Sequence, residues 1–595
     1  MSLMGGLYIG TSGLQTGQNA LNTTAHNLSN MDNTGYVRQQ VQQSSRSYLK
    51  LSVDVKSVNN KQTGLGVNYS RVKHIRDYFL DKTYRRESGR SMFYEVSMQV
   101  TDEVESQLGE LNGEAFQNTL EDLWTAVQEV AKDPASSVTQ GLLVQRAAEF
   151  VQRAGAVYEG FCAYQDNLNL QIKKQVDKIN EYGKQILALN ESIRSIEAGG
   201  IESANDLRDA RDNILDELAQ MANINYDEDP QGNVWVQIEG MDFVKGPICF
   251  EMGLDVDEQT GFYTPYWPQN SSFDENGNFK LDSKGNPLRD DVFDLSLRIS
   301  TDLNTDVGGL KAMLHARGDH RANYTDLASD KYDDVSQSIV MNIQAEFDQL
   351  IHNVATKVNE ILAGAAGVKT ADKDILASDG KTILVKAGEK YCENNVGGYM
   401  RKDDGSPLQM FGKLTTEGYR KVTGTVDVKD ENNIVIGTEE KEYWIYNEED
   451  AGDPSSLYTI ENLQVDPELM QKPSMLGFRL PDGSEDKATA TALKDAFMAE
   501  EYTLNPNVKK PTNFVNYYTD LVSQVANSGY AFESIYYNQE NAMESIQSAR
   551  EQVSGVSSDE ELSNMIKFQN AYNASSRYIN VIDEMLEHLL STLGV

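Results

Sequence analysis

The side chains that most often carry catalysis or bind metals are few and scattered in this chain. It has six histidines and three cysteines in 595 residues. His315 and His320 are five residues apart, which is a poor fit to one helical face, and the zinc-protease motif HExxH is absent. Cys162, Cys249 and Cys392 are far apart and odd in number, so neither a zinc site nor a disulfide framework is predicted. We expect no metal and no cofactor.

Other motifs for ligand chemistry are incomplete. The turns DEDPQG (227–232) and DENG (274–277) faintly resemble calcium loops, but an EF-hand loop needs glutamate at position twelve, where this chain has Ile238 and Gly285. We interpret both as hairpin turns. Glycine-rich phosphate loops and GxSxG elbows are absent, because GLGV (64–67) lacks the third glycine and the helix. The chain is therefore expected not to be an enzyme.

One short string matches an adhesion tripeptide, Arg317-Gly318-Asp319. It lies where a helix is expected to turn, which favours a local cap or salt bridge. An adhesive role for these residues stays open from the sequence alone.

The charge is large, negative and uneven. The net charge is −38, which excludes general nucleic-acid binding and favours a well-hydrated surface. Residues 1–90 hold twelve basic and five acidic residues, a net of +7, so the rest carries −45. We interpret this basic segment as a face that complements an acidic neighbour.

No run of about 18 apolar residues predicts a membrane span. The N-terminus also lacks the basic region and apolar core of a cleaved secretory signal. If the protein is exported, we expect a system that recognises an uncleaved segment.

The strongest pattern lies at the two ends of the chain, where residues 4–28 and 565–589 each predict a coiled-coil helix. The first has leucine every seven residues, at Leu7, Leu14, Leu21 and Leu28, with Met4, Thr11, Gln18 and Ala25 between them. The second carries Met565, Phe568, Tyr572, Ser575, Ile579, Ile582, Leu586 and Leu589 in the same three-and-four step.

Two such helices at opposite ends of a long chain suggest that the ends pack together. Gly13 and Gly17 lie inside the first helix, and each costs about 1 kcal/mol relative to alanine. A helix with these residues is expected to be weak alone and to gain order on assembly. We therefore expect proteolysis of the monomer to remove roughly the first 50 and last 50 residues.

Helical and β patterns alternate between these ends. Residues 31–90 predict extended chain, with Val53, Val55 and Val58 among polar residues. Residues 91–222 predict helices, and Ser203 with Asp206 looks like a capping box. A long heptad within them has Ile172, Ile179, Ile186 and Ile193, with Tyr182, Leu189 and Ile196 in the alternate positions. Residues 207–221 predict a further amphipathic helix, with an apolar stripe at Leu207, Ile214, Leu218 and Met221.

The second half repeats this alternation. Residues 223–300 predict strands, 305–365 a return to helix, 366–510 strands and turns, and 511–595 helix to the end. The fold class is therefore mainly α with inserted β domains. It combines terminal coiled-coil helices with a long antiparallel helical bundle and two outer β-rich inserts.

These patterns divide the chain into four expected domains. A terminal coiled-coil domain comprises 1–60 and 545–595, and a long helical bundle comprises 61–222, 301–365 and 511–544. A β-rich domain covers 223–300, and a second inserted β-rich domain covers 366–510.

The opening segment resembles the N-terminal signature of bacterial flagellar rod, hook and hook-associated proteins, whose usual core is Asn-x-x-Thr-Pro-Gly-Tyr. Asn30, Gly35 and Tyr36 match, while Asn33-Thr34 stands where Thr-Pro is expected. The missing proline leaves φ unfixed at that turn.

The closing segment SGVSSDEELSNMIKFQNAYNASSRYINVIDEMLEHLL (554–590) is similar to the C-terminal signature of the same family. Ser558 and Glu561 have the spacing of a capping box within it. Its ending INVIDEMLEHLL is most similar to the branch at the hook–filament junction. Residues 203–218 and 308–319 also resemble that branch, while the β inserts resemble nothing that we can name.

The resemblance implies a structural subunit of the flagellum that forms a junction ring between hook and filament and is needed for filament assembly. It implies that the terminal helices form the inner tube. Implied partners are further copies of the chain, the hook protein, the second junction protein and the flagellin side of the filament. A cytoplasmic export chaperone at the C-terminal helix is also implied, with type III export to the extracellular flagellum.

Three alternatives stay open. One is an axial protein with an enzymatic insert at 366–510, against which the missing metal and nucleophile motifs argue. A hook or distal rod protein would share both terminal signatures, although the heptad at 172–196 argues against it, because hook middles are mostly β. A secreted adhesin with flagellar-type termini would use its outer domains and the tripeptide at 317–319 to bind surfaces.

Overall fold

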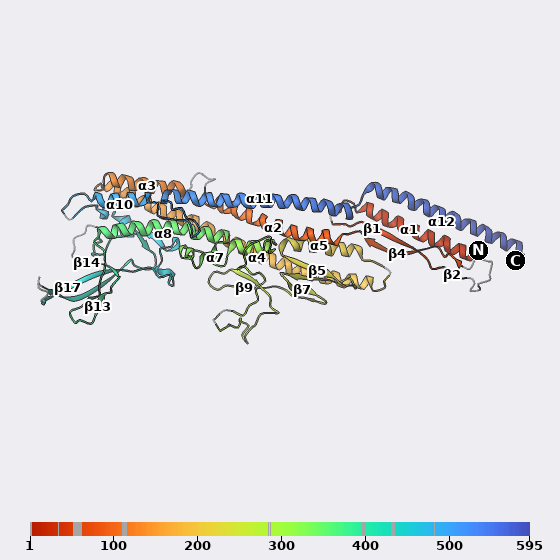
Figure 1. Cartoon of the computed structure of the whole chain (residues 1–595), viewed down its shortest axis with the longest axis horizontal. Helices are drawn as coiled ribbons and strands as arrows, with labels where there is room; N and C mark the ends of the chain where they lie inside the picture. Colours follow the sequence, from red (N-terminus) through yellow and green to blue (C-terminus); the bar gives the residue numbers. More distant parts are fainter. Residues whose placement is uncertain are drawn as a thin grey trace.

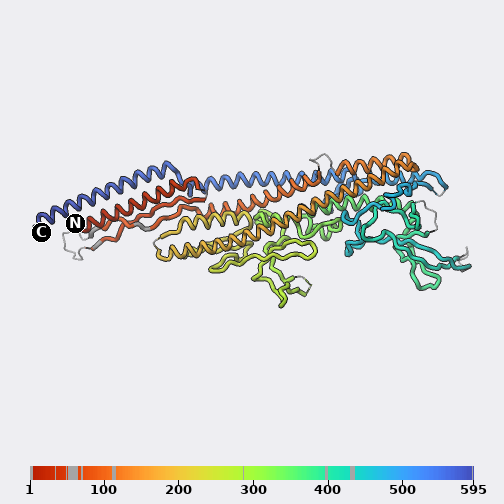
Figure 2. Tube along the Cα trace, turned by 180° about the vertical axis from the view of Figure 1, so that it is seen from behind, coloured from red at the N-terminus to blue at the C-terminus, as the bar shows by residue number. Residues whose placement is uncertain are grey.

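The chain forms a long rod with both termini at one end (Figures 1 and 2). The computed structural model describes residues 3–33, 35–50, 62–109, 116–200, 202–283, 285, 287–394, 400–429, 435–480 and 482–594. The sheet built from residues 369–446 lies at the end opposite the termini. The first and last helices lie side by side, as their sequence patterns predict.

The terminal end of the rod is built from two helices and a strand pair. Helix α1 (Leu3–Ser29) packs along α12 (Ser558–Leu593). The antiparallel strands β1 (Gln39–Ser45) and β4 (Val67–His74) contact α1, and β2 (Leu49–Lys50) pairs with β3 (Gln62–Thr63). Val53, Val55 and Val58, which the sequence places in extended chain, lie outside the described residues.

The body of the rod is a helical bundle with one hydrophobic core. Its helices are α2 (Tyr78–Gln107), α3 (Phe116–Lys132), α4 (Ser137–Glu197), α5 (Asn205–Met221), α6 (Gly309–Arg317), α8 (Ile339–Ala365), α10 (Lys487–Met498) and α11 (Phe514–Ser554). The short η2 (Tyr324–Leu327) and α7 (Tyr332–Val335) connect α6 to α8. Phe116, Phe150 and Phe347 meet in the core, with ring centroids 5.0–5.5 Å from Phe116. Helices from distant parts of the sequence thus share one core, and α11 runs beside α2 (Figure 1).

Helix α4, with 61 residues, is the long helix against which much of this bundle packs. Its heptad isoleucines, Ile172, Ile179, Ile186 and Ile193, are all buried, which confirms the predicted stripe. Ile196, which continues that pattern in the sequence, is 43% exposed instead, because the helix ends at Glu197 beyond the packed region.

A small β unit lies on α4. Strands β5 (Ile224–Glu228), β6 (Val234–Ile238), β7 (Met241–Lys245) and β8 (Ile248–Cys249) form one antiparallel sheet in that order. The strands β9 (Gly253–Val256) and β10 (Tyr263–Tyr266) pair beside it. The predicted alternation is confirmed in β6, where Val234, Val236 and Ile238 are buried while Trp235 is 45% exposed.

Three asparagines of α4 dock this β unit through its backbone. Asn180 Nδ2 donates to Met252 O, and Met252 N donates to Asn180 Oδ1 (3.0 and 2.8 Å). Asn190 bonds both backbone groups of Val234 in the same way, and Asn169 bonds Gly261 O and Tyr263 N. Spacings of eleven and ten residues are each about three helical turns, so all three side chains lie on one face.

The region 366–510 is not only strand and turn. Strands β11 (Lys369–Thr370), β14 (Lys390–Glu393), β17 (Val435–Tyr446) and β16 (Tyr419–Lys429) form a sheet in that order, with β12 (Ile375–Leu376) and β13 (Ile383–Val385) paired beside it and β15 (Phe411–Lys413) paired with β18 (Leu463–Val465). This region also contains α9 (Pro467–Gln471), α10 and the 3₁₀ turns η3 (Pro454–Ser456), η4 (Ile460–Asn462) and η5 (Pro473–Leu476). The sequence-based interpretation missed α10, whose Leu493 and Phe497 pack into the bundle core.

Other predictions were wrong at the ends of elements. Residues 78–90 are helical rather than extended, because Asp77 caps α2 by accepting from the backbone of Phe79 and Leu80. Ser203 does not cap α5; Glu197 Oε1 accepts from Ala204 N there instead. Leu207 and Met221 of the stripe predicted in α5 are only half-buried, while Leu218 is buried.

The final helical region breaks once. Helix α11 ends at Ser554, and α12 starts after the N-cap Ser557, one residue before the predicted cap at Ser558. A β-carbon on Gly555 would press on the carbonyl oxygen of Glu551, which explains glycine at this bend.

The class "mainly α with inserted β regions" is thus confirmed. The domain boundaries remain a proposal. Because β4 packs with α1 and α11 continues unbroken to Ser554, we propose boundaries for the terminal domain near residues 76 and 555 rather than 60 and 545.

Candidate assembly interface at the paired termini

The helices α1 and α12 meet along a row of glycines. A β-carbon at Gly6 would lie 2.5 Å from Ile582 Cδ1, one at Gly10 would lie 2.6 Å from Ile579 Cγ1, and one at Gly13 would lie 2.6 Å from Ser575 Oγ. Gly17 faces the backbone of Tyr572. Rising numbers on α1 meet falling numbers on α12, so the helices are antiparallel. The spacing of four, three and four residues makes these glycines the seam of the pair.

The predicted seam of α1 is therefore displaced. Leu7, Leu14, Leu21 and Leu28 are only half-buried and lie about 60° around the helix from the glycines. The alternate positions Met4, Thr11, Gln18 and Ala25 are exposed and form no seam within the chain. Gly13 and Gly17 belong to this seam and are not defects, because a β-carbon at Gly13 would collide with Ser575 Oγ and one at Gly17 would press against the Tyr572 backbone at 3.4 Å.

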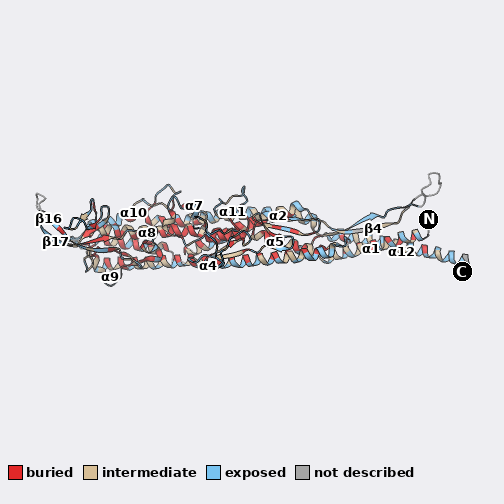
Figure 3. Cartoon of the chain, turned by 90° about the horizontal axis from the view of Figure 1, so that it is seen from below, coloured by how far each residue is buried: buried red, intermediate tan, exposed pale blue. Residues whose placement is uncertain are grey.

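On α12, four of the predicted residues face the glycines of α1: Tyr572, Ser575, Ile579 and Ile582. Ile582 is buried at 6% exposure, and Met565, Phe568, Tyr572, Ser575, Ile579 and Leu586 are half-buried. Leu589 is 42% exposed. A second apolar stripe beside this seam is more exposed, although its first residue, Tyr578, still touches α1 near Gly6 and Gly10. It comprises Tyr578, Val581, Met585 and Leu589, each 38–53% exposed. The terminal end of the rod is mostly exposed in Figure 3, in contrast to the red core of the bundle.

The opposite face of α1 carries small polar residues that bind the strand pair. Ser12 Oγ accepts from Val67 N at 3.2 Å. A β-carbon on Gly66 would touch Ser12 Oγ and the Cα of Ile9, so only glycine fits this approach. Buried Ser12 and Asn27 thus serve strand contacts that a search for apolar stripes overlooks.

A buried cluster ties the first signature segment to α12. Asn27 Oδ1 accepts from Tyr36 OH (2.8 Å) and Gln39 N (3.0 Å), while its Nδ2 donates to Gln39 O and Glu561 Oε2. Glu561 is 2% exposed and accepts from Arg38 Nε at 2.9 Å. Burial, followed by nearby carboxylates, raises the pKa of Tyr36, so its hydroxyl stays a donor. Glu561 is thus an anchor for Arg38 rather than the helix cap that its spacing predicts.

The other signature residues fix the turn after α1. Asn30 Nδ2 donates to His26 O at 3.0 Å, and Asn33 Nδ2 donates to Asn30 Oδ1 at 2.6 Å. Gly35 has φ +78°, and a β-carbon there would collide with the Asn213 amide on α5. Thr34, which replaces the expected proline, lies outside the described residues.

The joint between the terminal end and the bundle is a network of arginine–aspartate pairs. Arg76 pairs with Asp81 at 3.0 Å and also with Asp212, and Arg550 bridges Asp81 and Asp216 at 2.6 and 2.7 Å. Arg85 pairs with Asp212 and Asp216 at 3.1 and 2.6 Å. Basic residues of the first 90 positions thus meet an acidic face of α5, which confirms the predicted complementarity.

Two titratable groups face each other across this joint. His74 Nε2 at the end of β4 lies 3.6 Å from Asp209 Oδ1 on α5, and Asp209 Oδ2 accepts from Val37 N. Burial lowers the pKa of His74 to about 4, and burial raises the pKa of Asp209 to about 7. Both groups therefore tend toward their neutral forms. A further contact across the joint is made by Asp206 of α5, which accepts a hydrogen bond from Gln39 Nε2.

The remaining candidate residues have local structural roles. Arg317 is 2% exposed and donates to Asn169 Oδ1 and Tyr263 O, so the arginine of the tripeptide at 317–319 is not displayed, whereas the Asp319 side chain is exposed. The two aspartate turns are hairpin turns, in which Asp229 and Asp274 accept from backbone amides.

The histidines and cysteines do not gather. Within the described ranges, no three histidine, cysteine or carboxylate side chains are placed to hold a metal ion. None of the described helices is both long and apolar enough to cross a membrane.

Sequence reasoning missed three sets of residues: the glycine seam, the anchor at Glu561 and the aspartates of α5. The glycines carry a signal in their heptad-like spacing, but a search for apolar residues does not register them. The aspartates of α5 also carry a signal in the sequence, because their negative charge complements the basic segment 1–90. Nothing local in the sequence links Glu561 to Arg38, which is 523 residues away.

Comparison with known proteins gives matches over the whole length of the chain. The model of the helical domain of flagellar hook-associated protein FlgK matches residues 101–375. The model of the C-terminal part of flagellar basal body rod proteins FlgEFG matches residues 547–592, and that of the flagella basal body rod protein matches residues 7–36.

Individual relatives agree. Flagellar hook-associated protein 1 of Bacillus subtilis (strain 168) is 22% identical over 590 residues, covering 99% of this chain and 98% of the relative. The proteins of the same name from Escherichia coli (strain K12) and Salmonella typhimurium are 21% and 23% identical, each with 98% of both chains covered.

A solved structure, that of the flagellar hook junction protein FlgK from Burkholderia pseudomallei, aligns with a TM-score of 0.48 and 14% identity. The alignment covers 80% of this chain and 100% of that one. Over its whole length the chain is thus similar to flagellar hook-associated protein 1, with a helical middle that matches the FlgK helical domain and ends that match flagellar basal body rod proteins.

Proposed function

We propose that this protein is the structural subunit of the junction between the flagellar hook and the filament. The full-length similarity to flagellar hook-associated protein 1 supports this role. The observation that carries it in this chain is the terminal helix pair, which is held together internally by glycines but keeps apolar residues exposed on its outside. An exposed apolar stripe of this kind fits a surface that another subunit covers.

We propose that neighbouring copies cover these faces. On α12 the stripe Tyr578, Val581, Met585 and Leu589 has heptad-like spacing, which fits a further helix packed against it. On α1, Leu7, Leu14, Leu21 and Leu28 form a half-buried row between the glycine seam and the open face, and a helix from a second copy would complete their burial. The termini would then line the inside of a ring or tube.

The partners follow from the position in the flagellum. Copies of this chain would contact each other and the hook protein on one side, and the second junction protein and the filament on the other. A cytoplasmic chaperone covering the face from Met565 to Leu589 would prevent aggregation before export. Export without a cleaved signal and a purely structural, non-enzymatic role complete the proposal.

The experiment is electron microscopy of cells that lack this protein, with the spent medium probed for flagellin. Bare hooks with flagellin in the medium are the expected result. Missing hooks would move the assignment to a rod or hook protein, and intact filaments would overturn the junction role.

A further inference from the structure

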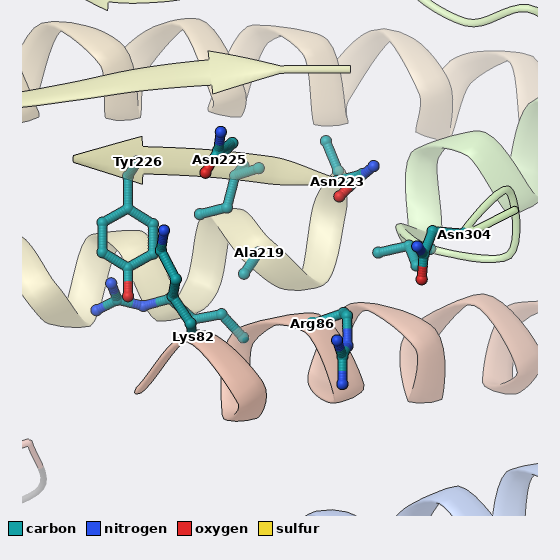
Figure 4. A pocket seen from close by; sticks show the side chains of 11 residues that line it. Lys82, Arg86, Ala219, Asn223, Asn225, Tyr226 and Asn304 are labelled. Atoms are coloured by element: carbon teal, nitrogen blue, oxygen red, sulfur yellow. The ribbon is translucent and has the colours of Figure 1, made fainter. Parts of the chain in front are cut away.

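A cavity of about 230 Å³ between α2, β5 and the loop before α6 has an unusual wall (Figure 4). Its polar lining consists of Lys82, Arg85, Arg86, Asn223, Asn225, Asn304 and Tyr226, with no carboxylate. The chain has 91 acidic and 53 basic residues, and three larger cavities in its described parts each include three or more carboxylates. A wall with only cations, amides and a phenol therefore departs from the rest of the molecule.

The tyrosine at this cavity lacks a hydrogen-bond partner. Tyr226 projects from β5 toward α2 (Figure 4) and is 7% exposed. Its buried hydroxyl bonds no atom of the described residues. Burial raises the pKa of Tyr226, so the hydroxyl remains a proton donor. A buried donor without an acceptor is unfavourable. The hydroxyl oxygen itself is closed to solvent, so an acceptor in the cavity would relieve it once the side chains that cover it move aside.

The three cations differ in how far they are neutralised. Arg85 is 3% exposed in its side chain and is held by Asp212 and Asp216, with its guanidinium 4.4 Å from the centre of the Tyr226 ring. It is part of the wall rather than a source of free charge.

Lys82 and Arg86 are more accessible to solvent than Arg85, with side chains 40% and 53% exposed. Lys82 Nζ lies 3.7 Å from Asp227, and Arg86 lies 2.8 Å from Glu87. Glu87 is shared with Arg90 and Gln539, so its charge is divided between two guanidiniums. Lys82 and Arg86 are thus each paired with one carboxylate, while their side chains still reach solvent at the mouth of the cavity.

We propose that this cavity binds a small oxyanion, with Lys82 and Arg86 supplying charge and the Tyr226 hydroxyl donating a hydrogen bond. The volume lies below the roughly 300–1,000 Å³ of pockets for drug-sized ligands, which fits a tetrahedral anion or a single carboxylate group. Two sources share this chemistry: free phosphate or sulfate, and an aspartate or glutamate side chain of a second copy of this acidic chain.

The test uses calorimetric titration of the full-length protein with inorganic phosphate, sulfate and acetate at constant ionic strength. Saturable binding is expected, and Lys82→Gln with Arg86→Gln should weaken it at least tenfold. Tyr226→Phe should weaken it several-fold without lowering the anion-free melting temperature, because the lost hydroxyl has no partner. The control Lys174→Gln with Lys494→Gln removes two exposed charges elsewhere and should change nothing.

Sedimentation of the same variants separates the two sources. If a second copy supplies the carboxylate, phosphate and the Lys82/Arg86 variant should both weaken self-association. If the anion is free, self-association should be unaffected while titration still shows the site. Absence of saturable binding together with unaffected self-association would overturn the proposal, as would equal loss of binding in the control variant.

Discussion

Replacing Gly10 by leucine sets helix propensity against packing in the terminal pair. Leucine is about 1 kcal/mol more favourable than glycine in a helix interior, so propensity alone predicts a firmer α1. A β-carbon at Gly10 would lie 2.6 Å from Ile579 Cγ1 and 3.3 Å from Tyr578 Cδ1. Packing therefore predicts that the two helices separate.

The magnitude follows from what separation uncovers. Ile582 is 6% exposed and Ile579 is half-buried. Burial of an isoleucine side chain contributes about 1.5–3 kcal/mol, so exposing these two costs about 3 kcal/mol. Subtracting the propensity gain leaves about 2 kcal/mol, or roughly a thirtyfold shift in the opening equilibrium.

Hydrogen exchange of the monomer measures this directly. Amides of residues 3–29 and 558–593 should exchange roughly thirty times faster in Gly10→Leu than in the unsubstituted protein. Gly155→Leu in α4 is the matched control, because a β-carbon at Gly155 meets no atom within 4 Å. It should leave terminal exchange unchanged. Slower or equal exchange in Gly10→Leu would refute the glycine seam.

Three further changes test other contacts. Glu561→Gln removes the buried carboxylate partner of Arg38 and should destabilise the terminal end by about 1–3 kcal/mol in urea denaturation. The control Glu560→Gln changes an exposed partner of the same arginine and should cost under about 1 kcal/mol. Equal effects of the two substitutions would contradict the buried anchor. Burial raises the pKa of Glu346 to about 7, so its protonated form favours the fold and stability should fall as pH rises from about 4 to 7. Glu346→Gln should reduce that fall in melting temperature between pH 5 and pH 8, and an unchanged pH profile would count against the shifted carboxyl. Arg317→Ala should destabilise the bundle by about 1–3 kcal/mol, because its buried hydrogen bonds are lost. The control Arg321→Ala removes a half-exposed arginine four residues later and should change thermal stability little. Loss of cell adhesion by a folded Arg317→Ala variant would instead support the adhesin hypothesis.

Much of the architecture could be predicted because it follows from the regular spacing of apolar residues along the sequence. The buried isoleucines of α4 and the alternation in β6 depend on local patterns that a sequence displays directly. The pairing of the termini also follows, since two long seams at opposite ends of a chain need partners.

The details of the terminal interface could not be predicted by the same rule. Glycine has no side chain to register in an apolar pattern, so that pattern predicts the leucine row as the seam of α1. In the structure Gly6, Gly10, Gly13 and Gly17 form the seam instead. Adjacent serines made the cap of α12 ambiguous by one residue. Helix α10 was missed because short strands and turns surround it in the sequence.

In the junction, we propose, copies of this chain cover the exposed stripe of α12. Complementation of a deletion strain with Val581→Glu and Met585→Glu tests it, since both residues are exposed in the single chain and should not disturb its fold. We expect this variant to be secreted yet to leave hooks bare, with flagellin in the medium. Filaments in normal number and length would contradict it.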